Sequence, residues 1–169
     1  TVPFVHIGVF ARDIGLSDID GALAVSIVGL FALVGSMLLG ALSDRVGSKA
    51  ALALALGSQV IGFILFWIAE SAAFLNAGAV AFGVFFGGVA TVFPSRGGDL
   101  FGSTHAGAIG GFIFAAGGLL GAWGPALTGY LRDVYGDFRL AFLLCVSSAS
   151  LAFVLFMLLP RSTASSKAE

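Results

Sequence analysis

Long runs of apolar residues alternate with short polar segments along almost the whole chain. Five runs, residues 18–42, 49–69, 72–94, 104–131 and 138–159, are long enough to cross a membrane. A helix needs about 20 apolar residues to span roughly 30 Å of hydrocarbon. A sixth run, residues 2–11, would reach only about 15 Å as a helix. The pattern predicts an all-α membrane protein: a bundle of five complete transmembrane helices and one partial helix.

The polar residues between the runs predict where the helices begin and end. Ser17 and Asp20 have the S-x-x-D spacing of a capping box. Pro94 and Pro160 stand where two of the runs stop, which favours helix ends there. The remaining runs are preceded by residue types that are common at N-caps: Ser48, Ser71, Ser103 and Asp137.

Composition supports a membrane protein. The chain is 59% hydrophobic and 10% charged, with a mean hydropathy of +1.07, whereas soluble domains carry about 25% charged residues. Its 25 glycines and 17 phenylalanines are typical of helices that pack closely in lipid. The net charge of -1 gives no sign of a nucleic-acid partner. The lone Cys145 lies inside an apolar run and is interpreted as a packing residue.

The segment between the first two complete spans carries the most specific motif. Residues 40–49 read G-A-L-S-D-R-V-G-S-K. The spacing G-x-x-x-D-[RK]-x-G-x-[RK] resembles the signature loop of the major facilitator superfamily of secondary transporters, and its fixed positions are Gly40, Asp44, Arg45, Gly47 and Lys49. Between two membrane spans the match is specific.

The resemblance implies a larger molecule. A facilitator has twelve spans in two halves, and the loop recurs between the second and third helices of the second half. Residues 1–160 therefore resemble the C-terminal half, from within helix seven through helix twelve, with 161–169 as a cytoplasmic tail. The chain begins with Thr1 and a half-length helix, so we expect a fragment whose N-terminal half is missing. The expected partners are that half, the lipid bilayer and a small-molecule substrate.

Two further strings resemble bacterial carriers of the monocarboxylate and oxalate–formate type. Residues 93–102 contain F-P-x-x-x-x-D-L-F-G, and residues 121–129 read G-A-W-G-P-A-L-T-G. Such carriers often place an Arg in helix eight and, in the oxalate type, a Lys in helix eleven. The corresponding segments here, 26–40 and 112–121, carry no charge. Either the missing half supplies the cation, or the substrate is not a small anion.

Lys and Arg predict the orientation. With the 44–49 loop inside, five cations lie on the inner side and three on the outer side, a modest bias in the expected direction: Arg45, Lys49, Arg96, Arg161 and Lys167 against Arg12, Arg132 and Arg139. We expect a bacterial plasma membrane, with the loop and the tail cytoplasmic.

Polar groups at membrane depth are costly, so each is a functional candidate. His6 is a candidate proton carrier or donor to an anionic substrate, with an interfacial histidine as the equal alternative. Gln59 and Asn76 are interpreted first as interhelical hydrogen-bonding residues. Arg96, at the inner end of helix ten, either attracts an anion or, as we favour, anchors the helix at the headgroups.

Glycine spacing suggests both packing and movement. The pairs Gly83/Gly87, Gly107/Gly111 and Gly117/Gly121 are four residues apart, so each pair lets another backbone approach one helix face. A cluster around one proline favours bending as much as packing; its members are Gly121, Gly124, Pro125 and Gly129. The signature loop is expected to act as a conformational latch, in which Arg45 pairs with Asp99, the only acid at the inner end of helix ten.

The sequence thus predicts a secondary transporter for a small organic solute, with a monocarboxylate as one candidate and drug or metabolite efflux as the alternative. A homo-oligomeric channel or structural membrane protein is the alternative from another class, but the sequence shows neither a filter nor a ring of charge. An enzyme is disfavoured because Asp, Glu and His do not gather at one depth. No cofactor and no metal are expected.

Overall fold

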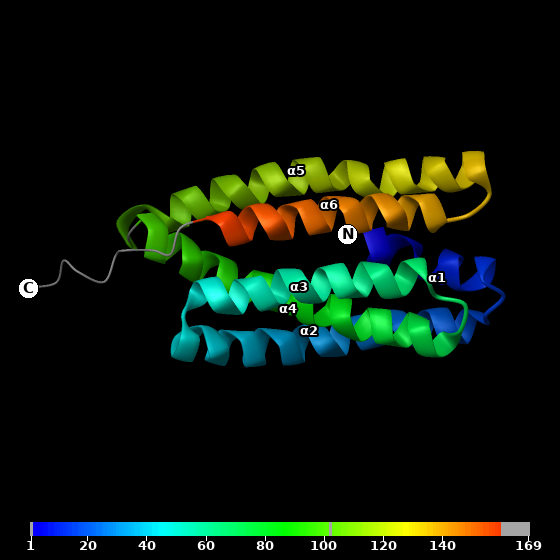
Figure 1. Ribbon diagram of the computed structural model, residues 1–169, viewed down its shortest axis with the longest axis horizontal. Helices are drawn as coiled ribbons and strands as arrows, with labels where there is room; N and C mark the ends of the chain where they lie inside the picture. The colour runs from blue at the N-terminus through cyan, green and yellow to red at the C-terminus, as the bar shows by residue number, and fades with distance from the viewer. Residues whose placement is uncertain (1, 102, 160–169) are drawn as a thin grey trace, which may run out of the picture.

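The computed structural model describes residues 2–101 and 103–159, without the side chains of residues 2, 99–106 and 120 (Figure 1). Every element in these ranges is a helix: α1 (Val2–Asp13), α2 (Asp18–Val46), α3 (Ser48–Trp67), α4 (Ala72–Phe101), α5 (Ser103–Tyr135) and α6 (Arg139–Leu158). Five of them, α2 to α6, are long and apolar enough to cross a membrane. The short α1 occupies only one end of the bundle (Figure 1). The predicted all-α bundle is confirmed.

The predicted capping box is present, whereas two predicted N-caps are wrong. The Ser17 hydroxyl accepts from the Asp20 N–H at 3.2 Å, and the Asp20 carboxylate accepts from the Ser17 N–H at 3.1 Å, which completes the capping box of α2. The N-cap of α6 is Phe138 and not Asp137, although Asp137 accepts from the N–H of Arg139, the first residue of α6, at 3.0 Å. Ser48 is not an N-cap, because α3 begins one residue earlier than expected. Its cap is Gly47, whose φ of +90° favours glycine.

The expectation that Pro94 ends its helix is also wrong. α4 continues through Pro94 to Phe101, a length of 30 residues. A proline removes one backbone hydrogen bond and bends a helix, but the apolar surroundings of a membrane favour continued helix over an open, unsatisfied backbone. The residues after Pro94 therefore extend the helix instead of forming a loop.

Glycines bring α2 and α4 into backbone contact. A Cβ added at Gly83 would lie 2.7 Å from the Val28 carbonyl oxygen, and one added at Gly87 would lie 1.8 Å from the Ala32 carbonyl oxygen. Small residues are thus required where these helices cross, as the four-residue spacing predicts. The α5 pairs behave differently: a Cβ added at any of four glycines would meet nothing within 4 Å, namely at Gly107, Gly111, Gly117 and Gly121.

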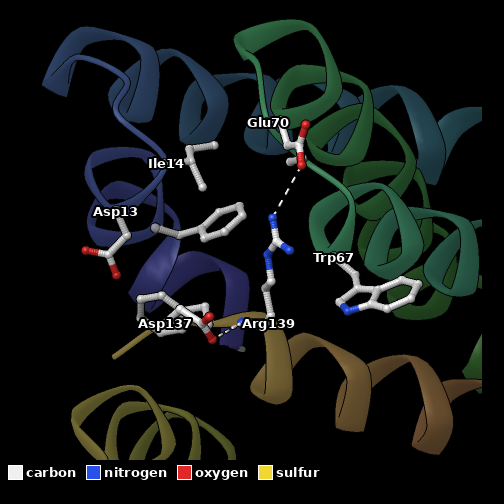
Figure 2. A pocket seen from close by; sticks show the side chains of 9 residues that line it. Asp13, Ile14, Trp67, Glu70, Asp137 and Arg139 are labelled. Atoms are coloured by element: carbon white, nitrogen blue, oxygen red, sulfur yellow. Dashed lines mark hydrogen bonds and ion pairs between the residues drawn. The ribbon is translucent and has the colours of Figure 1, made fainter. Parts of the chain in front are cut away.

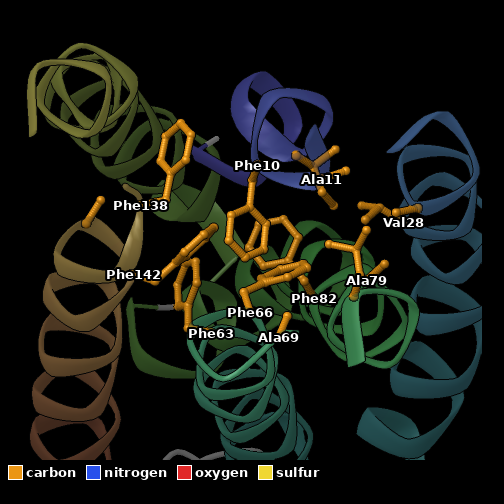
Figure 3. Packing of buried hydrophobic residues seen from close by; sticks show 14 of the residues in the cluster. Phe10, Ala11, Val28, Phe63, Phe66, Ala69, Ala79, Phe82, Phe138 and Phe142 are labelled. Atoms are coloured by element: carbon orange, nitrogen blue, oxygen red, sulfur yellow. The ribbon is translucent and has the colours of Figure 1, made fainter. Parts of the chain in front are cut away.

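The core is rich in phenylalanine and includes the partial helix. Phe10 of α1 lies 4.8 Å from Phe142 of α6, measured between ring centroids, and Phe142 lies 5.6 Å from Phe66 of α3 (Figure 3). Phe66 and Phe142 are almost completely buried. Because α1 supplies a central ring to this core, its position is fixed by packing.

The outer faces of the bundle are apolar. Large side chains of α2 and α6 are exposed, as expected where lipid is the solvent: Leu30, Leu33 and Met37 on α2, and Leu151, Val154 and Leu158 on α6.

Candidate functional site

His6 joins α1 to the bend region of α5. Its Nε2 atom lies 2.9 Å from the carbonyl oxygen of Pro125. The ring is partly buried, and its centroid lies 5.3 Å from that of Phe138 in the turn before α6. The structure therefore brings together two features that the sequence separates by 119 residues: the candidate proton carrier and the candidate flexing segment.

This hydrogen bond fixes the proton arrangement on the His6 ring. A carbonyl oxygen only accepts, so Nε2 must carry a hydrogen. In the neutral ring Nδ1 is then the unprotonated nitrogen, and any added proton must bind there. Among the described residues, Nδ1 has no hydrogen-bond partner. The Nδ1 atom is thus the ring nitrogen of His6 that the contact with α5 leaves unoccupied.

The Pro125 carbonyl is also approached from within α5. The Thr128 hydroxyl lies 3.0 Å from both the Gly124 and the Pro125 carbonyl oxygens, and Thr128 is 4% exposed. Gly129 faces His6, since a Cβ added there would lie 3.6 Å from the ring atom Cε1. This contact is therefore surrounded by three of the predicted flexing residues, Gly124, Pro125 and Gly129. The fourth, Gly121, lies about one turn before Pro125 on the same helix.

An ion pair joins the same two helices nearer their C-terminal ends. Arg132 of α5 donates to both carboxylate oxygens of Asp13, at 3.0 and 2.9 Å. The Asp13 side chain is 19% exposed and that of Arg132 is 38% exposed. A two-bond Arg–carboxylate pair is more specific than a single contact. Arg132 was predicted to lie on the outer side, but its pairing with Asp13 was not predicted, because the two residues are 119 positions apart in the sequence.

A cavity of about 480 Å³ lies beside this pair, at the end of the bundle that contains α1 (Figure 2). Phe10, Phe138 and Trp67 form much of its apolar wall. Arg139 extends across it toward Glu70, with a separation of 3.3 Å. Both of these side chains are largely exposed, so the pair contributes little to stability.

The signature segment is mostly helical. Asp44 and Arg45 lie in the last turn of α2, Gly47 forms the whole connection, and α3 follows at once. Asp44 and Arg45 are exposed and have no ion-pair partner within the described part of the chain. Gly40 packs near α4, with an added Cβ 3.2 Å from the Thr91 methyl group. The side chain of Asp99, the expected partner of Arg45, lies outside the described residues.

Lys49 has a contact that the sequence did not reveal. Its Nζ atom donates to the carbonyl oxygen of Met157, at 3.3 Å, and to that of Leu159. These carbonyls belong to the end of α6, where the last carbonyls of a helix lack helical partners. Lys49 thus caps α6 from another helix, with a charge that suits the negative end of the helix dipole.

The other polar candidates are distributed over α3 and α4. Arg96 is 6% exposed, so other residues cover it, and its role as a headgroup anchor stays a prediction. Gln59 is partly buried on α3 and makes no hydrogen bond with the described residues. The Asn76 Oδ1 atom is buried without a hydrogen-bond partner in the described part of the chain. The structure brings none of these three residues together with His6.

Comparison with known proteins agrees with this architecture. Residues 1–169 match the Major Facilitator Superfamily. The chain is 33% identical over 146 residues to monocarboxylate transporter 13 of Bos taurus, covering 83% of this chain and 34% of that protein. It is 31% identical over 174 residues to monocarboxylate transporter 11 of Mus musculus, covering 95% and 38% respectively. The chain spans about a third of the length of these relatives. It therefore belongs to the Major Facilitator Superfamily.

Proposed function

We propose that the chain is the C-terminal half of a longer secondary transporter, which carries a small organic solute by alternating access. Its match to the family over the whole chain supports this proposal. So does its similarity to proteins named monocarboxylate transporters, which are about three times as long. Monocarboxylates are thus the first substrate class to test.

The observation that carries the mechanistic part is the His6–Pro125 hydrogen bond. It places a histidine side chain directly against the proline-containing segment of α5. We propose that proton binding at Nδ1 of His6 is coupled to solute movement. The added charge would favour the helix arrangement in which a carbonyl or an anionic solute can approach the ring.

The two segments in which the carriers of small carboxylates place a cation, 26–40 and 112–121, carry no charge in this half. A residue that lines a cavity between two halves would be exposed in one half alone, whereas Arg96 is 6% exposed. We propose that Arg96 takes part in the packing between helices and does not reach the solute. We propose that the N-terminal half provides the positive charge that a monocarboxylate needs.

Efflux of an apolar drug or metabolite is the second candidate, and an aromatic pair favours it. Phe4 of α1 and Phe86 of α4 contact each other edge to face at 5.0 Å between centroids. Their exposed fractions are 37% and 44%. Such rings would contact an apolar solute without any charge.

We further propose that the Asp44–Lys49 end of the bundle is cytoplasmic and acts as a latch. Asp44 is exposed at the end of α2, where it can accept hydrogen bonds from the N-terminus of a neighbouring helix. Arg45 is equally exposed, as a partnership with Asp99 requires. A bacterial plasma membrane stays a prediction, since the relatives named above are animal proteins.

Uptake assays on the full-length protein in proteoliposomes test the proposed function. The panel contains short monocarboxylates, a dicarboxylate and a hydrophobic amine, each with and without an inward proton gradient. Saturable monocarboxylate uptake that the gradient accelerates supports the first candidate. Transport of the amine alone supports efflux, and the absence of any saturable flux would refute both.

A further inference from the structure

The two polar contacts between α1 and α5 share one register. His6 and Pro125 are 119 residues apart in sequence, and so are Asp13 and Arg132. The contacts are therefore seven residues apart on each helix, or about 10 Å along the axis. Equal spacing on both helices means that α1 and this part of α5 run parallel, in a fixed alignment over two turns.

Phe138 fills the space between the two contacts. Its ring lies 5.3 Å from that of His6 and 6.1 Å from that of Phe10, measured between centroids. The Arg132 guanidinium carbon lies 5.9 Å from the Phe138 centroid, within the range of a cation–π contact. Phe138 is only 2% exposed, so its side chain fills the space between the two polar contacts.

Most of the rest of α5 is exposed or only partly buried within the described residues. Among its described side chains, only Thr128 is buried, and Thr128 lies beside the His6–Pro125 contact. The half of α5 before Pro125 has six glycines at which an added Cβ would meet nothing within 4 Å: Gly107, Gly110, Gly111, Gly117, Gly118 and Gly121. Its aromatic contact with α4 is Phe93–Phe114, at 5.0 Å.

We propose that these residues form a clasp, defined as His6 with Pro125 and Asp13 with Arg132, that keeps α1 and the end of α5 together as one unit throughout transport. Asp13 and Arg132 are positioning residues: they hold α5 in the register at which His6 meets the Pro125 carbonyl. The part of α5 that moves during the cycle is the glycine-rich half before Pro125. The role of the clasp in transport rests on the proposed function above, whereas the two contacts themselves do not.

Crosslinking tests the clasp in the full-length protein, with Cys145 and any other native cysteine replaced. The variant Asp13→Cys/Arg132→Cys is treated with a bifunctional methanethiosulfonate, which joins α1 to α5 through disulfides. We expect efficient crosslinking and less than a two-fold loss of uptake. The matched variant Phe93→Cys/Phe114→Cys joins α4 to the glycine-rich half of α5. Here we expect at least a five-fold loss that a reducing agent reverses.

Three results would overturn the clasp: no crosslink at 13/132, reversible loss of uptake when that crosslink forms, or unaltered uptake with the 93/114 crosslink. If removal of the charges impairs the cysteine variant before any crosslinking, charge exchange provides the test. Asp13→Arg/Arg132→Asp should then recover at least a third of the uptake that each single reversal loses, and no recovery would count against the clasp.

The crosslink yields separate this inference from the proposed function. If the unmodified protein carries no solute of the panel, the proposed function fails. The clasp still predicts that the 13/132 yield is the same with and without solute, measured at a single pH because the thiolate is the reacting form of cysteine. A yield that changes several-fold between these conditions would show that α1 and α5 separate.

Discussion

Gly87 of α4 lies directly on the backbone of Ala32 of α2, so closely that an added Cβ would come within 1.8 Å of the Ala32 carbonyl oxygen. Because that neighbour is backbone, it cannot move aside as a flexible side chain would. The whole of α2 must shift instead, and the two helices must separate over several turns.

Gly87→Ala is therefore expected to destabilise the protein by about 1–3 kcal/mol, the usual cost of overpacking. Gly111→Ala is the matched control, since an added Cβ there would meet nothing within 4 Å and alanine is the better helix former. Thermal unfolding of both variants in detergent gives the comparison. Equal melting temperatures for the two variants would show that α2 and α4 do not pack as described.

Removing the Lys49 ammonium should weaken the attachment of α6. Lys49→Met leaves the carbonyls of Met157 and Leu159 without this donor, at an expected cost of about 0.3–1 kcal/mol. Lys49→Arg keeps the charge and should lose less. Hydrogen exchange at the end of α6 measures the effect locally. Unaltered exchange in Lys49→Met would mean that the contact does not stabilise the helix end.

His6→Gln separates proton binding from hydrogen bonding. A glutamine amide can still donate to the Pro125 carbonyl, but it cannot take up a proton near neutral pH. In the full-length transporter we expect His6→Gln to flatten the pH dependence of uptake, while crosslinking at 13/132 is retained. His6→Ala should lose both the pH dependence of uptake and the crosslinking at 13/132. A normal pH profile in His6→Gln would leave His6 as a structural donor only.

The latch at the signature segment predicts an effect on turnover. Asp44→Asn should lower the maximal uptake rate several-fold and leave the half-saturating substrate concentration within a few-fold, because the residue lies far from the membrane centre. A pair at this wet boundary is worth about 1 kcal/mol, which shifts a balanced equilibrium several-fold. Exchanging the charges of Arg45 and Asp99 should restore part of the rate that either reversal loses. Loss of substrate binding in Asp44→Asn, or no restoration in the exchange, would refute the latch.

The sequence revealed the helices because their signal is local. Long apolar runs and the Ser17–Asp20 spacing depend only on neighbouring residues, so the five spans and the capping box were predictable. The continuation of α4 through Pro94 could not be predicted in the same way. A proline excludes one hydrogen bond, but the membrane-like surroundings that favour more helix are a property of the whole segment.

The contacts at the site join residues that are far apart in the sequence. His6 and the Pro125 region could each be singled out, one as a titratable group at membrane depth and the other as a break in a helix. Their hydrogen bond could not, nor could the pairing of Asp13 with Arg132. The equal separation of 119 residues was visible in the numbering, but it has meaning only once α1 and α5 are known to be parallel neighbours.

We propose that this chain is one half of a transporter whose solute pathway lies between two halves. The most direct test compares monocarboxylate flux in proteoliposomes that contain this chain alone, the full-length protein, or neither. We expect saturable flux for the full-length protein, and for this chain alone only the leak of empty liposomes. Saturable flux through this chain alone would show that the pathway does not need a second half.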